Sequence, residues 1–449
     1  MTHAGGYPRV LVVDSTPFCR HVNNGIVKSN LFQGWPREGL AQIVYANVQP
    51  GFDVCEAYWA LTKTSIVLGA VGLARDESLR GTAALPGTMF DPLEAHAFEA
   101  RPGIERMLSR LSSAIRVPIG ETVLRLPSAK SRRLTAWIRR FAPEAVFTMG
   151  GLTPILRLAA LIAQSERVPL IPYFTDDWVT CIYPSGPFHS LLRRSFAHWF
   201  RRCLQLSTVR MTSSAAMSRE YERRYGGRFE TFANPVEPFE AHEEPKRACV
   251  QLCFIGSLSP NRWQPLRAIG VALERLRKRG VLGELVIYSL PEDLRRFGQH
   301  FAGFEAIVIG GTVAPSEVGR RQLDANILVH VESFDAESRM LTRYSLSTKI
   351  PQYMMAGRCL LAVGPAEAAS IRYVRDSGAG PAVSTDDTSV LCDELARLLT
   401  DPLLRQAYGV QGRQTAVLRH DATTAREQFR TLVAEAYSDH VRGGDSCRS

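Results

Sequence analysis

The sequence predicts an α/β protein with two doubly wound domains, and three observations lead to this prediction. The chain has 449 residues, enough for two or three domains that each bury a core. Hydrophobic residues make up 45% and charged residues 22%, as in globular proteins. Short β-branched runs alternate with helical patterns both before and after a polar segment near residue 240, which indicates two sheets covered by helices.

The first half begins with Arg9–Asp14 (RVLVVD), which is typical of the first parallel strand of a doubly wound sheet. Residues 51–126 give no clear pattern, and we assign no chemistry to them. Four further strands and one helix are expected, with the strands at Pro143–Met149, Val168–Phe174, Thr208–Ser213 and Phe229–Asn234 and the helix at Thr153–Ser165.

Glu237–Arg247 is polar, acidic and proline-bearing, and we interpret it as a linker between domains. The pattern then repeats. Strands are expected at Val250–Ile255, Glu284–Ser289, Ala306–Ile309, Asn326–Val331 and Cys359–Val363, and helices at Trp263–Arg279, Lys349–Ala356 and Ser389–Leu399. We therefore place an N-terminal domain at residues 1–240, a C-terminal domain at 241–415, and a final helix and tail at 416–449.

Composition argues against several kinds of site. The nine cysteines include no C-x-x-C pair, so neither a disulfide framework nor a zinc site is expected. No histidine pair has metal-ligand spacing and no D-x-D motif is evident, so we expect neither a metal nor another cofactor. No secretory signal opens the sequence and the apolar runs are too short to span a bilayer, which favours a cytoplasmic protein.

The net charge of +10 is concentrated in residues 101–210, which contain 17 Lys or Arg residues and only 6 Asp or Glu residues. A basic face suits phosphates, anionic lipids or nucleic acid, although an ordinary solvated surface explains it equally well. No nucleic-acid recognition motif accompanies it, and the aromatic residues do not form a stacking pattern, so we expect no nucleic-acid partner.

The segment Phe188–Leu206 has leucine and aromatic residues near one face, flanked by four arginines. Such a segment can lie on the inner, anionic face of a membrane, as a peripheral contact. The interpretation that we prefer is a helix that buries its apolar stripe in the first domain, because most such stripes are core.

Four stretches together resemble a known family. They are Phe254–Arg262 (FIGSLSPNR), Ser345–Gly364 (SLSTKIPQYMMAGRCLLAVG), Tyr373–Asp401, and, in the first half, Asn24–Gly25 with Tyr225–Gly226 and Asn234–Val236. This set resembles the group 1 (family 4) glycosyltransferases. Their fold, called GT-B, has two Rossmann-like domains facing a cleft, and it implies that the last helix crosses back to the first domain.

The first stretch implies part of a donor site. The family has a Gly-Arg turn and, six residues after the glycine, a lysine that faces the donor diphosphate. Here the glycine is Gly256, the arginine position holds Ser257, and the lysine position holds Arg262. Arginine keeps the cation and can contact two phosphate oxygens at once.

The second stretch implies a phosphate site at a helix start. Ser347 and Thr348 are suitable caps and Lys349 adds a charge, beside amides that the first helical turn leaves free. The family usually has two glutamates eight positions apart, and those positions hold Tyr344 and Gln352 here. Gln352 can still bond a ribose hydroxyl.

Candidates in the first half lie where strands are expected to end, which is where open α/β sheets gather ligands. Asn24 and Gly25 open a helix near the expected donor phosphates, and His21 precedes them on the acceptor side. Asp176 and Asp177 follow a buried strand, where they can bind an acceptor or, for Asp177, act as a base; capping of a helix explains the pair as well.

The resemblance implies transfer of a sugar, with retention, from a UDP or GDP sugar to a glycan or lipid-linked acceptor, in the setting of bacterial polysaccharide synthesis. Arg262 and Lys349 would then neutralise the departing diphosphate. Two alternatives share the fold: a sugar-nucleotide epimerase, and a non-catalytic relative that binds nucleotide or glycan, which the missing glutamates make plausible.

Overall fold

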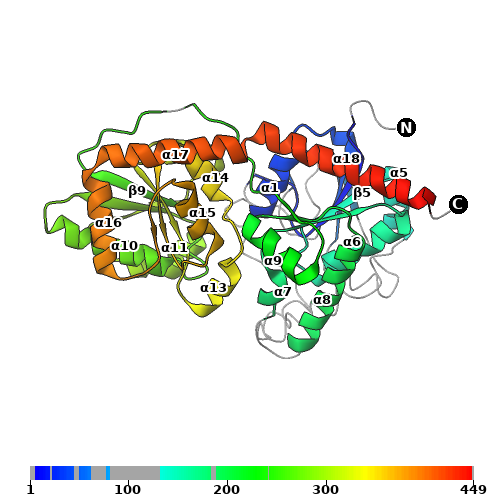
Figure 1. Ribbon diagram of the computed structural model, residues 1–449, viewed down its shortest axis with the longest axis horizontal. Coiled ribbons are helices and arrows are strands. Elements are labelled where there is room, and N and C mark those ends of the chain that lie inside the picture. The colour runs from blue at the N-terminus through cyan, green and yellow to red at the C-terminus, as the bar shows by residue number, and fades with distance from the viewer. Residues whose placement is uncertain are drawn as a thin grey trace. The chain divides into compact units, whose positions relative to one another are not determined.

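The computed structural model consists of two compact units, residues 1–232 with 426–449, and residues 233–425. Figure 1 shows that each unit has a central sheet with helices on both faces. The structure describes residues 6–20, 23–44, 50–61, 77–80, 132–183, 189–240 and 242–446. His21 and the basic residues 101–131 therefore lie outside the described residues.

The sheet of the first unit has eight strands in the order β4-β3-β2-β1-β5-β6-β7-β8, and only β4 runs antiparallel to its neighbour. The central strand β1 is buried along its whole length, which explains its apolar sequence. The strands are β1 (Val10–Asp14), β2 (Leu40–Val44), β3 (Ala57–Ala60), β4 (Glu77–Arg80), β5 (Ala145–Thr148), β6 (Leu170–Phe174), β7 (Met211–Thr212) and β8 (Glu230–Thr231).

Aromatic side chains fill both faces of this sheet. Phe429, from the last helix of the chain, packs edge-on against Phe32 with ring centroids 4.8 Å apart, so the C-terminal helix completes the core of the first unit. On another face Phe174 contacts Phe200. The helices are α1 (Asn23–Leu31), α5 (Arg132–Phe141), α6 (Thr153–Glu166), α7 (Trp178–Cys181), α8 (His189–Gln205) and α9 (Ala215–Tyr225), with a short 3-10 turn, η1 (Arg37–Gly39). The last helix, α18 (Ala422–Ser446), belongs to this unit from Arg426 onward.

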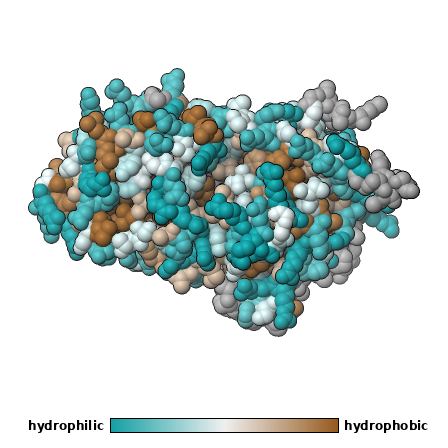
Figure 2. All heavy atoms as spheres, in the orientation of Figure 1, coloured by the Kyte–Doolittle hydropathy of each residue, from teal (hydrophilic) through white to brown (hydrophobic). Residues whose placement is uncertain are grey.

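Helix α8 buries most of the apolar stripe that the sequence predicts, including Leu192, Phe196 and Phe200, whereas Leu191 remains 57% exposed. The preferred interpretation of this segment, as a core helix, is therefore confirmed. Its arginines remain on the outer face, and Figure 2 shows hydrophilic residues along that part of the surface.

The sheet of the second unit is wholly parallel, with strand order β11-β10-β9-β12-β13-β14. In chain order this is 3-2-1-4-5-6, the arrangement of Rossmann domains, in which the order reverses between β9 and β12. The strands are β9 (Val250–Ile255), β10 (Gly283–Tyr288), β11 (Ile307–Gly311), β12 (Ile327–Val331), β13 (Cys359–Val363) and β14 (Ala382–Val383).

Alternate residues of each strand serve two separate cores. Leu252 and Val329 face one helical layer, whereas Cys253 and Leu328 face the other. By the same alternation His330 faces the layer that contains α14. The first layer has α10 (Trp263–Arg277), α11 (Pro291–Phe297) and α16 (Thr388–Thr400), and the second has α12 (Val318–Leu323), α14 (Lys349–Met355), α15 (Ala369–Ser377) and α17 (Pro402–His420).

The remaining elements of the second unit are α13 (Ala336–Thr342) and the 3-10 turns η3 (Gly298–Phe301) and η4 (Pro315–Glu317). The segment before β9 is fastened to this unit by three arginines. Arg358 donates to the carbonyl oxygens of His242 and Glu243, Arg405 pairs with Glu244, and Arg413 donates to the carbonyl oxygen of Phe239. The predicted linker is therefore fastened to the second unit at Phe239 and at His242–Glu244.

Candidate functional site

A loop of residues 256–262 leaves the carboxyl end of β9 and leads into α10, and carboxylates from other elements fasten it. Asp293 of α11 accepts from the Ser257 hydroxyl at 2.7 Å and from the Leu258 amide at 2.8 Å. Asp335 accepts from the Asn261 side chain at 3.2 Å. Because Ser257 is committed to Asp293, its hydroxyl helps to shape the loop.

Arg262, the last residue of this loop, is clamped by a third carboxylate. Its Nη2 donates to Oε2 of Glu332 at 3.0 Å, and its Nε is shared between that oxygen and the Val331 carbonyl, both at 3.2 Å. Its Nη1 donates to the Ser259 carbonyl at 2.9 Å. A guanidinium has five N–H groups, so this geometry orients Arg262 and leaves two of them for a ligand.

Glu332 directly follows β12 and its side chain is buried at 3% exposure. Burial opposes its ionisation, but Arg262 and His330 outweigh burial and hold the pKa of the Glu332 carboxyl at about 2. Burial lowers the pKa of His330, so its ring is neutral at pH 7 and its Nε2 donates to Oε1 of Glu332 at 3.1 Å. Glu332 is therefore an anion held between two donors.

Lys349, at the start of α14, belongs to the same cluster. Its ammonium lies against Gly256, where a Cβ would collide with it, and 5.6 Å from the centre of the Phe254 ring. Burial, and then the Arg262 guanidinium, lower the pKa of Lys349 to about 7, while Glu332 and Asp293 act in the opposite direction. Among the described residues, the Lys349 ammonium has no hydrogen-bond or ion-pair partner.

The structure thus brings the predicted residues Gly256, Ser257, Arg262 and Lys349 into one cluster in the second unit. The carboxylates Glu332, Asp293 and Asp335 were not predicted. One signal would have found Glu332: it is an acidic residue directly after a fully buried strand, and Asp176 and Asp177 were singled out by a similar position just beyond the end of β6.

The helix start beside Lys349 differs in detail from the prediction. Thr348, the residue before α14, makes no capping hydrogen bond with its side chain, so the expected cap is absent there. The Ser347 amide donates to the Ser370 hydroxyl at 3.0 Å and is not free for a phosphate. Gln352 lies three residues after Lys349 on α14, so the two side chains share a helix face. The Tyr344 ring lies under the Arg343 guanidinium.

In the first unit, Asn24 and Gly25 lie in the first turn of α1, as predicted from the sequence. Gly25 has a packing role, because a Cβ there would collide with the Cys19 side chain and lie 2.9 Å from the Pro17 carbonyl. The loop that precedes α1 is also held by a fully buried ion pair between Lys28 and Asp14.

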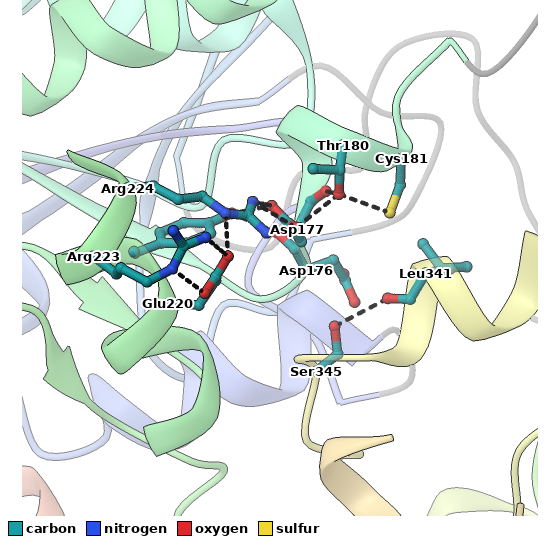
Figure 3. Close-up of polar contacts among 10 residues, drawn as sticks. Asp176, Asp177, Thr180, Cys181, Glu220, Arg223, Arg224, Leu341 and Ser345 are labelled. Carbon is teal, nitrogen blue, oxygen red and sulfur yellow. Dashed lines mark hydrogen bonds and ion pairs between the residues drawn. The ribbon is translucent and has the colours of Figure 1, made fainter. Parts of the chain in front are cut away.

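Asp177 lies inside a closed ion cluster (Figure 3). Its Oδ1 and Oδ2 both accept from the Arg224 Nη1, at 3.0 and 2.9 Å. Oδ1 also accepts from the Tyr221 hydroxyl at 3.1 Å, and Oδ2 from the Thr180 hydroxyl at 2.7 Å. All four lone-pair positions are used and the residue is 1% exposed, so the geometry favours a positioning role over the predicted role as a base. The Asp176 side chain points away from Arg224 and is half-buried.

In the part of the chain that the structure describes, no three His, Cys, Asp or Glu side chains come close enough together to hold a metal ion. Within those same ranges, no helix has both the length and the apolar character of a membrane span.

Comparison with solved structures places this architecture. HepE from Anabaena, solved with UDP and glucose, matches with a TM-score of 0.60 and 10% identity over 96% of this chain and 100% of its own. The chain has the GT-B fold. Two further GT-B proteins agree: sucrose-phosphate synthase from Thermosynechococcus elongatus (TM-score 0.61, 12% identity, 96% of this chain and 100% of that one) and trehalose 6-phosphate synthase from Burkholderia multivorans (0.57, 12%, 99% of each).

No protein-family model matches the chain, and no curated protein matches it. At these identities the likeness shows the GT-B fold alone. The predicted fold class is confirmed, since both sheets are parallel apart from β4 and both are covered by helices.

Proposed function

We propose that this GT-B protein is a glycosyltransferase that uses a nucleoside diphosphate sugar, of UDP or GDP type, as donor. The observation that carries the proposal is that two cations, Arg262 and Lys349, lie near each other at the carboxyl ends of β9 and β12, where the strand order of the second sheet reverses. Ligands of open α/β sheets bind at this reversal point. In support, HepE has been solved with UDP-glucose.

The chemistry that this cluster can perform is stabilisation of a leaving diphosphate. When the bond between the sugar and the diphosphate breaks, negative charge grows on the phosphate oxygens, and fixed cations lower the energy of that state. Arg262 offers two oriented N–H groups and Lys349 an ammonium without an ion pair among the described residues. Gln352, on the face of α14 that carries Lys349, is suited to bonding a ribose hydroxyl. This chemistry uses no metal or other cofactor, and we propose that the sugar is transferred with retention.

For the acceptor we propose a glycan or a lipid-linked sugar that binds the first unit near Asn24 and Asp176. Asp176 is the better candidate of the aspartate pair to contact it, because Asp177 is buried in its ion cluster.

We also propose a peripheral contact with the anionic inner face of a membrane through α8. Its arginines line a cavity of about 550 Å³ together with Val179 of α7. Arg194 and Arg201 are exposed there, and each such cation contributes to attraction toward anionic lipid. Flotation with vesicles of phosphatidylglycerol, with Arg194→Glu/Arg201→Glu as the variant, tests this contact; equal flotation of both proteins would contradict it.

A thermal-shift screen against UDP-, GDP- and ADP-sugars tests the donor site. We expect one nucleotide class to raise the melting temperature, through preferential binding to the folded state, and Arg262→Ala to lose most of that rise. Incubation of the selected donor with the cell's glycolipid fraction should then release the nucleoside diphosphate. Binding without release would favour the non-catalytic relative, isomers of the donor sugar without an acceptor would favour the epimerase, and no response to any nucleotide would contradict the proposal.

A further inference from the structure

Glu332 contacts two polar side chains, those of Arg262 and His330, and the sequence predicted no role for it. Its Oε2 binds Arg262 and its Oε1 binds His330, so both oxygens are held in fixed directions. A buried carboxylate that spans two neighbours in this way holds their side chains in one geometry, since breaking either bond would leave a buried polar group unsatisfied.

We propose that Glu332 is the positioning residue of the donor site: it clamps Arg262 and balances its charge, and thereby leaves Lys349 as the cation that meets the diphosphate. This inference rests on the proposed donor binding. It assigns different roles to the two cations: Arg262 is held and neutralised by Glu332, and Lys349 contacts the diphosphate.

The contacts of the two cations support this division. Arg262 spends three of its five N–H groups on Glu332 and on the carbonyl oxygens of Val331 and Ser259. Lys349 spends none of its donors on any described residue, and Gly256 supplies the space for its ammonium. A diphosphate that enters the site therefore meets an oriented but neutralised guanidinium and an ammonium that is not yet paired.

The charges around Lys349 make this division measurable through pH. The groups that act on its ammonium are Arg262 at the start of α10, Glu332 after β12 and Asp293 on α11. Because the pKa of Lys349 is lowered to about 7 in the free protein, its charge is present below pH 7 and lost above it. A diphosphate binds the charged form, so binding takes up a proton above pH 7, and affinity should fall about tenfold from pH 6 to pH 8.

The experiment is calorimetric titration between pH 6 and 8.5 with UDP-glucose, or with GDP- or ADP-glucose if the thermal screen selects that base. The diphosphate of these donors is fully ionised across this range, so the ligand adds no titration of its own. Glu332→Gln removes the negative charge that stabilises the charged form of Lys349. In this variant, we expect the pH midpoint of the loss of donor affinity to move down by about half a pH unit or more.

Asp335→Asn is the matched control, because Asp335 also fastens the loop of residues 256–262 but does not act on Lys349. It should keep the wild-type midpoint, and Glu332→Asp, which keeps the charge, should restore it. If Glu332→Gln does not fold, Arg262→Gln replaces it: loss of a repelling cation should move the midpoint up.

Equal midpoints in wild type and Glu332→Gln, or equal shifts in Glu332→Gln and Asp335→Asn, would overturn the role of Glu332 while leaving donor binding intact. A wild-type protein that binds none of the three donors would instead contradict the proposed function itself.

Discussion

Both units contain a carboxylate that follows a parallel strand and pairs with an arginine. The two clusters differ in whether a cation beside them lacks an ion pair. Asp177, after β6, has its four lone-pair positions filled by Arg224, Tyr221 and Thr180. Glu332, after β12, has Arg262 and His330, and Lys349 stands beside them without an ion pair among the described residues. Charge clusters at strand ends are thus of two kinds, closed ones that fasten a loop and open ones that can take a ligand.

The largest expected effect is on stability, in the closed cluster. Arg224→Met leaves the buried Asp177 carboxylate without its counter-charge and should lower the free energy of unfolding by about 3 kcal/mol. Chemical denaturation followed by circular dichroism measures it. Arg223→Met on the same helix is the control, since Arg223 is 71% exposed in its pair with Glu220 and should cost about 0.5 kcal/mol or less. Equal losses would show that the Asp177 cluster is no more closed than a surface pair.

In the open cluster, loss of the Lys349 cation should weaken ligand binding without lowering stability. Lys349→Met should weaken donor binding about 30-fold, because a charge-assisted bond to phosphate is lost. The melting temperature of the free protein should stay equal or rise, since the lowered pKa of Lys349 means that folding disfavours its charge. Scanning calorimetry with and without the donor separates the two effects. A large drop in melting temperature of the free protein would assign Lys349 a structural role.

Gly256→Ala tests the space in which the ammonium lies. The added Cβ collides with the end of a flexible side chain, so Lys349 can shift aside and the fold should survive. We expect donor affinity to fall about threefold, less than for Lys349→Met, by calorimetric titration. Affinity equal to wild type would show that the position of the ammonium against Gly256 is not needed for binding.

The smallest expected effect compares two helix starts. Ser214 caps α9 by accepting from the Met217 amide at 3.0 Å, so Ser214→Ala should cost about 1 kcal/mol of unfolding free energy. Thr348 makes no such bond, and Thr348→Ala should cost about 0.3 kcal/mol or less. Urea unfolding of both variants provides the measurement, and a larger loss for Thr348→Ala than for Ser214→Ala would contradict this ranking.

The sequence predicted the second unit closely because strands such as β12 and β13 are buried along their whole length and its helices are amphipathic. Val250–Ile255 and Cys359–Val363 are strands with the predicted bounds, and the helix expected from Trp263 ends two residues early, at Arg277. The strands of the first unit were predicted less accurately. Leu40–Val44 and Ala57–Ala60 are strands that were not predicted, and the strands expected at 208–213 and 229–234 shrink to two residues each.

The candidate site was predictable only in part. Arg262 was found from its position six residues after Gly256 in the pattern that the resemblance implies, and Lys349 from its place at an expected helix start. Their interaction partners were not found, because Glu332 and Asp293 come from other strand ends and helices, and only the parallel sheet brings these together. For Asp177 the sequence shows an acidic residue at a strand end but not that Arg224, 47 residues later, closes it off.

The most direct test of the donor site is calorimetric titration of wild type and Lys349→Met at pH 6.5 with UDP and with uridine, or with the diphosphate and nucleoside of whichever base the thermal screen selects. The two ligands share a base and a ribose and differ in the diphosphate. If the cluster of Arg262, Glu332 and Lys349 holds a diphosphate, the variant should lose about 30-fold in affinity for UDP and keep its affinity for uridine. Equal losses for both ligands, or none for UDP, would contradict the assignment.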